Sequence, residues 1–280
     1  MLKQRVVTAV LMLAVLLPAL FHPQPGVFAG VTLLLIVGGG WEWARLNGVA
    51  EGPARALGAL LGLVLVLLWW AVGLQHPMPA VWLLAGLVWL AATIWLLRRG
   101  VPGWAPIAKP VRLWLGLVLI GLAWWAMAQA RQQGVVLLLS ILLLVWVADV
   151  AAYFGGKAFG RRKLAPHISP GKSWAGVYSG FLAVALLALV AVWAERHWGY
   201  QGASLYGQLW AFHPVMALLG VAFLTAMSVV GDLLESLVKR SAGVKDSSSL
   251  LPGHGGVLDR VDALLPVLPL AMLLLTLFPA

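Results

Sequence analysis

The chain has 280 residues, 62% of them hydrophobic and only 10% charged, and its mean hydropathy of +0.96 excludes an ordinary soluble domain and indicates an integral membrane protein. The net charge of +10 comes from short cationic clusters between long apolar runs, which suits loops beside anionic lipid headgroups and argues against a nucleic-acid partner. The chain has no cysteine, which excludes disulfides, thiolate metal sites and a cysteine nucleophile.

Nine apolar runs approach the length of about 20 residues that a helix needs to cross a bilayer. They are residues 6–21, 27–43, 56–74, 79–97, 112–130, 135–155, 174–194, 212–235 and 263–278. The second and the last are the shortest, so their ends are the hardest to place. We therefore predict an all-α, polytopic membrane protein with about nine transmembrane helices.

The distribution of cations predicts the orientation of these helices. If the N-terminus is cytoplasmic, 17 of the 19 Lys and Arg residues fall on the cytoplasmic side, and only Arg131 and Arg196 fall outside. The positive-inside rule therefore favours a cytoplasmic N-terminus and an external C-terminus. The first run has the basic flank of a signal peptide, but no small-x-small cleavage site follows it, so we expect an uncleaved helix.

The two halves of the chain differ in chemistry. We predict that residues 1–134 form an N-terminal group of five spans, and that residues 135–280 form a catalytic region with cytoplasmic loops at 156–173 and 236–262. Little in the first half suggests a site. Gly58 and Gly62 form a small-xxx-small pair that would let two helices approach closely, although chance spacing is an alternative in a chain with 31 glycines.

The sixth run ends in the first candidate site residue, Asp149. An ionisable group within a span usually faces the interior of the bundle or a hydrated cavity. Tyr153 and Lys157 follow at four-residue steps on the same helical face, so the alternative is that Asp149 merely pairs with Lys157 or extends to the interface. The loop that follows is basic and rich in Gly and Ser but lacks Walker A spacing, and it suits either an anionic headgroup or an ordinary surface patch.

The densest charge lies in residues 228–262, which hold five of the nine acidic side chains and four cations. These are Asp232, Glu235, Asp246, Asp259, Asp262, Lys239, Arg240, Lys245 and Arg260. If this segment is helical around Asp259 and Asp262, their three-residue spacing puts both on one face, where they can share a cation that prefers oxygen ligands. Carboxylates around a basic connector suit a metal-bound polyphosphate, and the alternative is a solvated basic loop with structural carboxylates.

Between these acidic clusters lies Pro252-Gly253-His254-Gly255-Gly256, which can turn tightly and bring backbone N–H groups close to a ligand. The predicted spans also give the depth of each carboxylate. Asp149 and Asp232 lie in the last third of helices that run inward, while Asp259 and Asp262 immediately precede the ninth span. We therefore predict that the four carboxylates converge on the cytoplasmic face.

Two blocks of residues, together roughly a quarter of the chain, resemble those of the phosphatidate cytidylyltransferases, also called CDP-diacylglycerol synthases. The signature block comprises Ser236, Lys239, Arg240, Lys245, Asp246, Ser248, Leu251, Pro252, His254, Gly255, Gly256, Asp259, Arg260 and Asp262. The other block comprises Asp149, Tyr153, Gly156, Lys157, Phe159, Gly160, Lys163, Leu164, Pro166, Ile168, Ser169, Pro170, Lys172, Ser173 and Gly176. Where the family commonly has Phe-Gly-Asn after Lys-Asp, this chain has Ser247-Ser248-Ser249, which we expect to loosen the loop.

The resemblance implies transfer of CMP from CTP to phosphatidic acid, which gives CDP-diacylglycerol and pyrophosphate. It also implies magnesium, alone or with a second cation such as K⁺, a homodimer, and a bacterial inner membrane with the active site facing the cytoplasm. Since two anionic reactants must meet, catalysis would depend on positioning, metal ions and fixed cations rather than on a protein nucleophile.

With the resemblance, the residues receive predicted roles. Asp232 and Asp259 would hold the catalytic cation, with Asp246 and Asp262 as further ligands. The triphosphate and the departing pyrophosphate would be bound by Lys239, Arg240, Lys245 and Arg260. A phosphate of phosphatidate or of CTP would be held by Ser169, Lys172 and Ser173, and Asp149 would orient one of the cations. The predicted substrate-binding set is completed by Lys157, Ser236, Gly255, Gly256 and His254, of which His254 either donates to a phosphate or only braces the turn.

Two other classes of protein are alternatives. A polyprenol or dolichol kinase also uses CTP in membranes, but it transfers the γ-phosphate and yields CDP. A transporter would use Asp149 and Asp232 as ion-coupling sites. Transporters commonly have related halves and sites at the bilayer midplane, whereas this sequence has no evident repeat and its charges gather at one predicted face.

Overall fold

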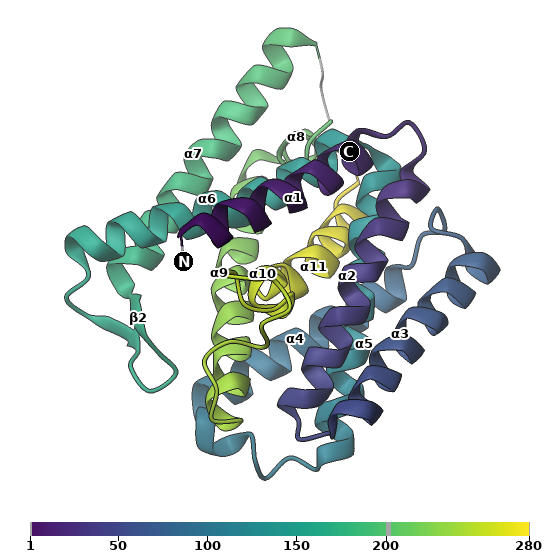
Figure 1. The fold of residues 1–280 in the computed structure, drawn as a ribbon. Coiled ribbons are helices and arrows are strands. Elements are labelled where there is room, and N and C mark those ends of the chain that lie inside the picture. The colour runs from purple at the N-terminus through teal and green to yellow at the C-terminus, as the bar shows by residue number, and fades with distance from the viewer. Residues whose placement is uncertain (1, 200–202, 280) are drawn as a thin grey trace. The chain divides into compact units, whose positions relative to one another are not determined.

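The computed structural model describes residues 2–199 and 203–279, and this part of the chain is almost entirely helical (Figure 1). Within it, eight helices are long and apolar enough to cross a membrane. They are α1 (Leu2–Phe21), α2 (Pro25–Leu46), α3 (Glu51–Val72), α4 (Pro79–Arg99), α5 (Lys109–Gln133), α6 (Val135–Phe159), α7 (Trp174–Trp198) and α9 (Pro214–Ser241). Each of the first eight predicted spans lies on one of these helices to within two residues at either end, so the prediction of a helical, polytopic membrane protein is confirmed.

Six shorter elements complete the described chain. They are η1 (Val101–Gly103), β1 (Lys163–Ala165), β2 (Ser169–Ser173), α8 (Leu205–Phe212), α10 (Leu258–Val261) and α11 (Leu264–Leu277). The ninth predicted span coincides with α11, an apolar helix of only 14 residues. The predicted loop 156–173 is shorter than expected, because α6 continues to Phe159 and an antiparallel hairpin of β1 and β2 forms most of the remainder.

The chain folds into two compact units that interleave along the sequence. The first unit contains residues 1–77, 101–133 and 235–262, and the second contains residues 78–100, 134–234 and 263–280. Helix α4 therefore groups with the C-terminal elements, and most of the signature stretch groups with the N-terminal helices. The division into compact units therefore does not coincide with the predicted boundary at residue 134. The catalytic role of residues 135–280 stays a prediction.

In the first unit, α2 packs along α3 and α5 (Figure 1). Glycines allow these helices to approach closely. A Cβ atom on Gly58 would lie 2.5 Å from the carbonyl oxygen of Val37, and one on Gly62 would lie 2.5 Å from Cγ2 of the same residue. A Cβ on Gly116 would overlap the indole ring of Trp43. The Gly58 and Gly62 pair therefore serves close helix packing, and its spacing is not accidental.

The end of α1 is bound by a cation from α5. Arg131 is buried, and its Nε and Nη2 atoms donate to the carbonyl oxygens of Leu20 and His22, each at 2.7 Å. The last carbonyls of a helix have no partner within the helix, so a guanidinium satisfies them well. One of the two cations on the predicted external side thus has a structural partner within the first unit.

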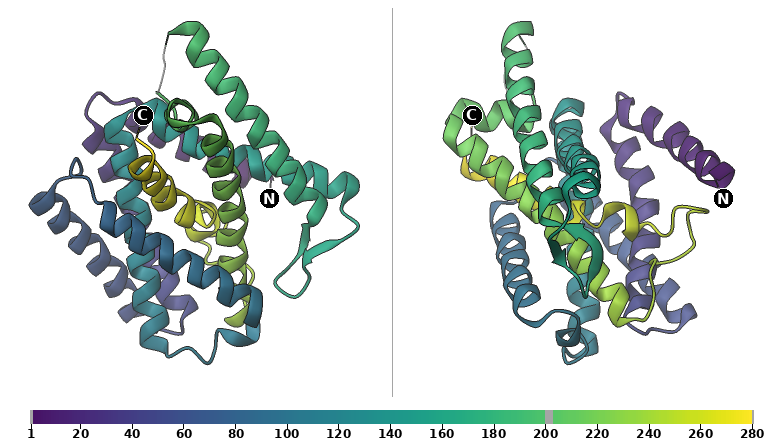
Figure 2. Two further views of the ribbon diagram at one scale, coloured as in Figure 1. Left: turned by 180° about the vertical axis from the view of Figure 1, so that it is seen from behind. Right: turned by 90° about the vertical axis from the view of Figure 1, so that its left-hand side faces the viewer.

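In the second unit, α7 packs back against α6, and the β1–β2 hairpin joins the two helices (Figure 2). The contact depends on small residues. A Cβ on Gly155 would overlap the side chain of Ser179, and one on Gly176 would lie 2.7 Å from the carbonyl oxygen of Ala152. Ser173 caps α7, because its hydroxyl accepts a hydrogen bond from the N–H of Gly176 at 3.2 Å.

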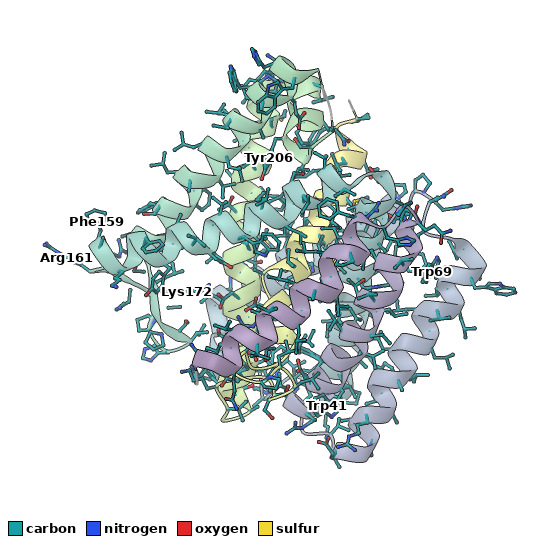
Figure 3. All side chains as sticks on the ribbon, turned by 45° about the horizontal axis from the view of Figure 1, so that its top comes forward. Trp41, Trp69, Phe159, Arg161, Lys172 and Tyr206 are labelled. Carbon is teal, nitrogen blue, oxygen red and sulfur yellow. The ribbon has the colours of Figure 1, made fainter. Side chains whose placement is uncertain are left out.

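The hairpin carries the predicted phosphate-binding residues. Figure 3 shows Phe159 and Arg161 at the end of α6, where the chain turns into the hairpin, and Lys172 on its second strand. Because Ser173 is at once the last residue of β2 and the N-cap of α7, the cap fixes the position of Lys172 relative to the helix. In the same unit, α4 packs against α11, with Gly86 facing Leu270 and Leu273.

Candidate functional site

In the first unit, the stretch after α9 encloses the carboxylate of Asp259. Its Oδ1 accepts a hydrogen bond from Nζ of Lys239 at 2.6 Å. Its Oδ2 accepts from the N–H of Ser247 at 2.9 Å, from the hydroxyl of Ser247 at 2.9 Å, and from the N–H of Gly256 at 2.7 Å. Lys239 also forms an ion pair with Glu235, one helical turn earlier on α9. Glu235 and Lys239 are four residues apart and therefore lie on the same face of α9.

The protonation of Asp259 follows from these contacts. Burial by itself raises the pKa of this carboxyl, but the hydrogen bonds from Lys239, Gly256 and Ser247 and the charge of Lys239 lower it, and the net pKa lies below the ordinary value of 3.8. Asp259 is therefore an ionised carboxylate at neutral pH. Its Oδ1 accepts a single hydrogen bond among the described residues, which leaves a lone pair for a further ligand.

A second carboxylate, absent from the predicted site, organises the same stretch. Glu42 on α2 is fully buried and accepts four hydrogen bonds. The hydroxyl of Ser248 and the N–H of Val257 donate to Oε1 at 2.5 and 2.9 Å. The hydroxyl of Ser247 and the N–H of Leu258 donate to Oε2 at 3.1 and 2.8 Å. Glu42 thereby holds the start of α10 and the loop before it against α2.

Glu42 lies outside both motif blocks, but its position in the sequence indicates a role. The residue is the one acidic side chain in the predicted span 27–43, and an ionisable group in a span usually has a function. Its hydrogen-bond partners lie 205 to 216 residues later in the chain, so no local pattern connects them. The tertiary structure alone identifies what Glu42 binds.

The structure differs from two predictions about this loop. The serines that replace Phe-Gly-Asn were expected to loosen it, but Ser247 and Ser248 fasten it to Glu42 and Asp259, so this prediction is wrong for both. The Gly-Gly segment was expected to offer backbone N–H groups to a ligand. In the structure, the N–H groups of Gly256 and Val257 donate to Asp259 and Glu42.

The two glycines of His-Gly-Gly are required by the two carboxylates. Gly255 has a φ of +84°, a conformation that L side chains rarely adopt, and a Cβ there would lie 2.6 Å from Oδ2 of Asp259. A Cβ on Gly256 would overlap both the hydroxyl of Ser247 and the carboxylate of Glu42. These glycines therefore leave room for the acidic side chains that hold the loop.

A polar cavity of about 570 Å³ adjoins this network in the first unit. Charged and polar side chains line it, among them Arg5, Lys245, Asp246, His254 and Arg260. Among the described residues, the buried Nδ1 atom of His254 has no hydrogen-bond partner, so the ring can pair with a group that enters the cavity. The structure thus brings together the predicted residues of the signature loop, and it adds Arg5 from α1.

A second cavity, of about 420 Å³, lies in the second unit and has a mainly apolar lining. Its lining includes the five predicted residues Asp149, Ser169, Lys172, Ser173 and Asp232. Nζ of Lys172 lies 2.7 Å from Oδ2 of Asp232, and both side chains are largely buried. Two carboxylates and a lysine therefore face one cavity, whereas Lys157, the alternative partner of Asp149, is exposed on α6.

Three other predicted residues, Ser236, Arg240 and Asp262, line neither of these two cavities. Ser236 and Arg240 lie in the last turns of α9, where Arg240 donates to the carbonyl of Val244 at 3.4 Å, and Asp262 directly follows α10. Asp232 belongs to the second unit and Asp259 to the first, so each is described with its own neighbours. No group of three or more acidic or histidine side chains gathers as a metal site among the described residues.

The donor chemistry nevertheless fits a hard cation. Asp149 and Asp232 present carboxylate oxygens to one cavity, and Asp246 presents another to the cavity of the first unit. Carboxylate oxygens are the ligands that magnesium prefers, and magnesium usually keeps several waters, so one or two carboxylates suffice to bind it.

Comparison with known proteins identifies the family of this chain. The model of the cytidylyltransferase family matches residues 3–278. The phosphatidate cytidylyltransferase of Pseudomonas aeruginosa is 42% identical over 280 residues, which cover 98% of this chain and 97% of that protein. The enzyme of the same name from Haemophilus influenzae is 34% identical over 293 residues, with 96% of both chains covered. That of Brucella suis is 36% identical over 231 residues, which are 80% of this chain and 68% of the relative. The chain is a member of the cytidylyltransferase family, alongside these phosphatidate cytidylyltransferases.

Proposed function

We propose that this protein is a phosphatidate cytidylyltransferase, which transfers CMP from CTP to phosphatidic acid and releases CDP-diacylglycerol and pyrophosphate for phospholipid biosynthesis. The observation that carries the proposal is the likeness, over almost the full length of both chains, to relatives that bear this name. Two cavities that each bring a cation and a carboxylate together in a membrane protein agree with it.

The chemistry requires the lipid phosphate to attack the α-phosphorus of CTP while pyrophosphate leaves. Both reactants are anions, so the protein must offset their repulsion with fixed positive charge and exact positioning of the reacting atoms. Lys245, Arg260 and Arg240, with Lys239, bind the triphosphate and stabilise the pyrophosphate that departs. Lys172, with the hydroxyls of Ser169 and Ser173, binds a phosphate in the cavity of the second unit.

Magnesium, alone or with a second cation such as K⁺, belongs to the proposal, with Asp232 and Asp259 as its ligands and Asp246 and Asp262 as further ones. A bound cation would neutralise charge on the phosphates. Other residues of this chain hold two of those carboxylates in place. Lys172 pairs with Asp232, and Lys239 and two backbone N–H groups hold Asp259.

The proposed location is inferred from the family resemblance and from the distribution of cations along the sequence. The protein lies in the bacterial inner membrane as a homodimer, with α11 as the ninth span, the N-terminus and active site in the cytoplasm and the C-terminus outside. The distribution of 17 cations to one side and two to the other supports this orientation. Because the chain has no cysteine, labelling of single introduced cysteines by an impermeant maleimide reports the side of each loop directly.

Product analysis tests the function. Purified protein in detergent, given CTP, magnesium and phosphatidic acid, should form CDP-diacylglycerol and pyrophosphate in equal amounts. A polyprenol or dolichol kinase would instead form CDP and a phosphorylated lipid alcohol. Formation of CDP without pyrophosphate, or no turnover with phosphatidic acid by folded protein, would contradict the proposal.

A further inference from the structure

An apolar groove of about 620 Å³ lies between α1 and α2 in the first unit and ends on the signature loop. Its walls come from both helices and from the loop, and they include Val7, Leu11, Val15, Val31, Leu34 and Pro252. No charged side chain lines the groove among the described residues. Its volume lies within the range of about 300–1,000 Å³ that is typical of pockets for small ligands, so it is more than a flat face between two helices.

The groove adjoins the polar cavity of the signature loop, since Gln4 and Leu251 line both. Two contacts fix α1 to the loop at this junction. The hydroxyl of Thr8 donates to the carbonyl oxygen of Pro252 at 2.8 Å. Gly253, with a φ of +78°, lies so close to α1 that a Cβ there would be 2.9 Å from Cγ of Arg5. Figure 2 (right) shows the loop before α10 extending toward the N-terminal end of α1.

Charge and hydrophobicity therefore change abruptly along one continuous surface. On one side of Gln4 and Leu251 the lining carries three cations, Arg5, Lys245 and Arg260, and on the other side it is apolar. A diacyl phospholipid with an anionic headgroup matches this surface, because its charged headgroup is joined directly to apolar acyl chains. A second copy of this chain would have to supply both an anionic group and a narrow apolar segment in that order.

We infer that the groove between α1 and α2 binds an acyl chain of phosphatidic acid, whose phosphate lies beside Arg5 in the polar cavity. This inference rests on the proposed function. The reaction joins the lipid phosphate to the α-phosphorus of CTP, so the headgroup must lie next to the triphosphate. Lys245 and Arg260, which bind the triphosphate in the proposal, line the same cavity as Arg5.

The dependence of activity on acyl-chain length tests the groove. Leu11→Trp fills the groove, and Leu13→Trp is its matched control, because both leucines are exposed on α1, at 62% and 52%, but only Leu11 lines the groove. The measurement is the ratio of kcat/KM for dioleoyl phosphatidate to that for dioctanoyl phosphatidate, in the same mixed micelles. Leu11→Trp should lower this ratio about tenfold, since displacing two buried methylene groups weakens binding by about that factor.

The control variant and a headgroup variant complete the kinetic test. Leu13→Trp should leave the ratio within about twofold of the wild-type value, as expected for a surface substitution. Arg5→Gln should raise KM for both lipids alike and leave the ratio unchanged, because it removes charge near the headgroup only. If Leu11→Trp and Leu13→Trp change the ratio equally, the groove does not select the acyl chain and the inference is wrong.

A cross-linking experiment that needs no turnover separates this inference from the proposed function. Phosphatidate with a diazirine on one acyl chain should label residues 7–16 and 31–35 of the wild-type protein, and phosphatidylcholine with the same chain should label them far less. Equal labelling by both lipids would indicate ordinary annular lipid and would overturn the inference, as would a change of oligomeric state in Leu11→Trp. Selective labelling by phosphatidate without formation of CDP-diacylglycerol would support the lipid site and contradict the proposed function.

Discussion

At the scale of single residues, Asp259 is the best defined carboxylate of the candidate site. It combines a short hydrogen bond to Lys239 with backbone donors from two loop residues, and its side chain is only 5% exposed. Asp232 has one cationic partner, Lys172, and faces a cavity. A lysine therefore holds each of the two carboxylates in place.

We predict that Asp232→Asn and Asp259→Asn each lower kcat by about 10²- to 10³-fold, the usual cost of removing one key electrostatic group. The assay is CTP-dependent formation of CDP-diacylglycerol by protein that elutes as wild type in size exclusion. Glu51→Gln is the control, since Glu51 pairs with Arg45 and Arg55 on the surface, outside both cavities. A loss below about tenfold would remove the residue from the proposed metal role.

Glu42 illustrates what a lone buried carboxylate requires. Two hydroxyls and two backbone N–H groups satisfy its oxygens, and the same bonds satisfy the first N–H groups of α10. Donors from residues 247–258 thus satisfy both carboxylate oxygens and hold this stretch against α2.

Glu42→Gln should destabilise the protein by about 1.5–3 kcal/mol and reduce activity more than the loss of stability explains. Each carboxylate oxygen accepts from one N–H group and one hydroxyl, and the NH₂ end of an amide can accept from neither. Thermal unfolding in detergent and kcat below the melting temperature measure the two effects. Ser248→Ala, which removes one of the four donors, should cost only about 1 kcal/mol. Equal effects of the two substitutions would argue against Glu42 as the anchor of the loop.

The pKa of Asp259 predicts how its contribution depends on pH. Since the folded pKa is below the unfolded value of about 4, its contribution to stability is complete above about pH 5 and disappears as pH falls through the folded value. The difference in melting temperature between wild type and Asp259→Asn should therefore be constant between pH 5.5 and 8 and shrink below about pH 4. A difference that grows on acidification would mean that the folded pKa is raised.

At the scale of elements, helix contacts in both units depend on the absence of a Cβ atom. Gly155 on α6 and Gly58 on α3 face a neighbouring helix where no methyl group fits. Such positions let helices approach closely and gain dispersion contacts, which matters in a bilayer because lipid is as apolar as the side chains. The hairpin between α6 and α7 depends on this contact, since it begins and ends at the two helices.

Gly155→Ala should therefore separate α6 from α7 and destabilise the protein by about 1–3 kcal/mol, as overpacking usually does. Gly30→Ala is the matched control on α2, because open space surrounds that position, and it should be neutral or slightly stabilising. Thermal unfolding in one detergent compares the two. If Gly155→Ala unfolds at the wild-type temperature, the close contact at this glycine does not contribute to stability.

At the scale of the whole molecule, the two units share the chain in an interleaved order. The signature stretch 235–262 folds in the unit of α1, α2, α3 and α5, although more than 100 residues separate them. Its anchors, Glu42 and Thr8, lie in the first 50 residues. The N-terminal helices therefore position the loop as well as cross the membrane.

This arrangement predicts that a fragment of residues 135–280, the region that sequence alone designates as catalytic, is inactive by itself. It lacks Glu42 and Arg5, so the loop has no anchor and one cation of the polar cavity is missing. Co-expression with residues 1–134 should restore part of the CDP-diacylglycerol synthesis. Activity of the isolated fragment would show that the signature stretch positions itself without α2.

The sequence by itself determined the helical membrane class and the first eight spans, because bilayer thickness and backbone hydrogen bonding require long apolar helices wherever the composition is apolar. The motif spacing also identified most charged residues of the two cavities, such as Lys245, Arg260 and Lys172. Only the tertiary structure decided what Glu42 and Arg131 bind, why Gly256 must be small, and that Ser247 tightens its loop. The partners of a buried charge are set by how distant segments meet, and no local pattern in the chain records that meeting.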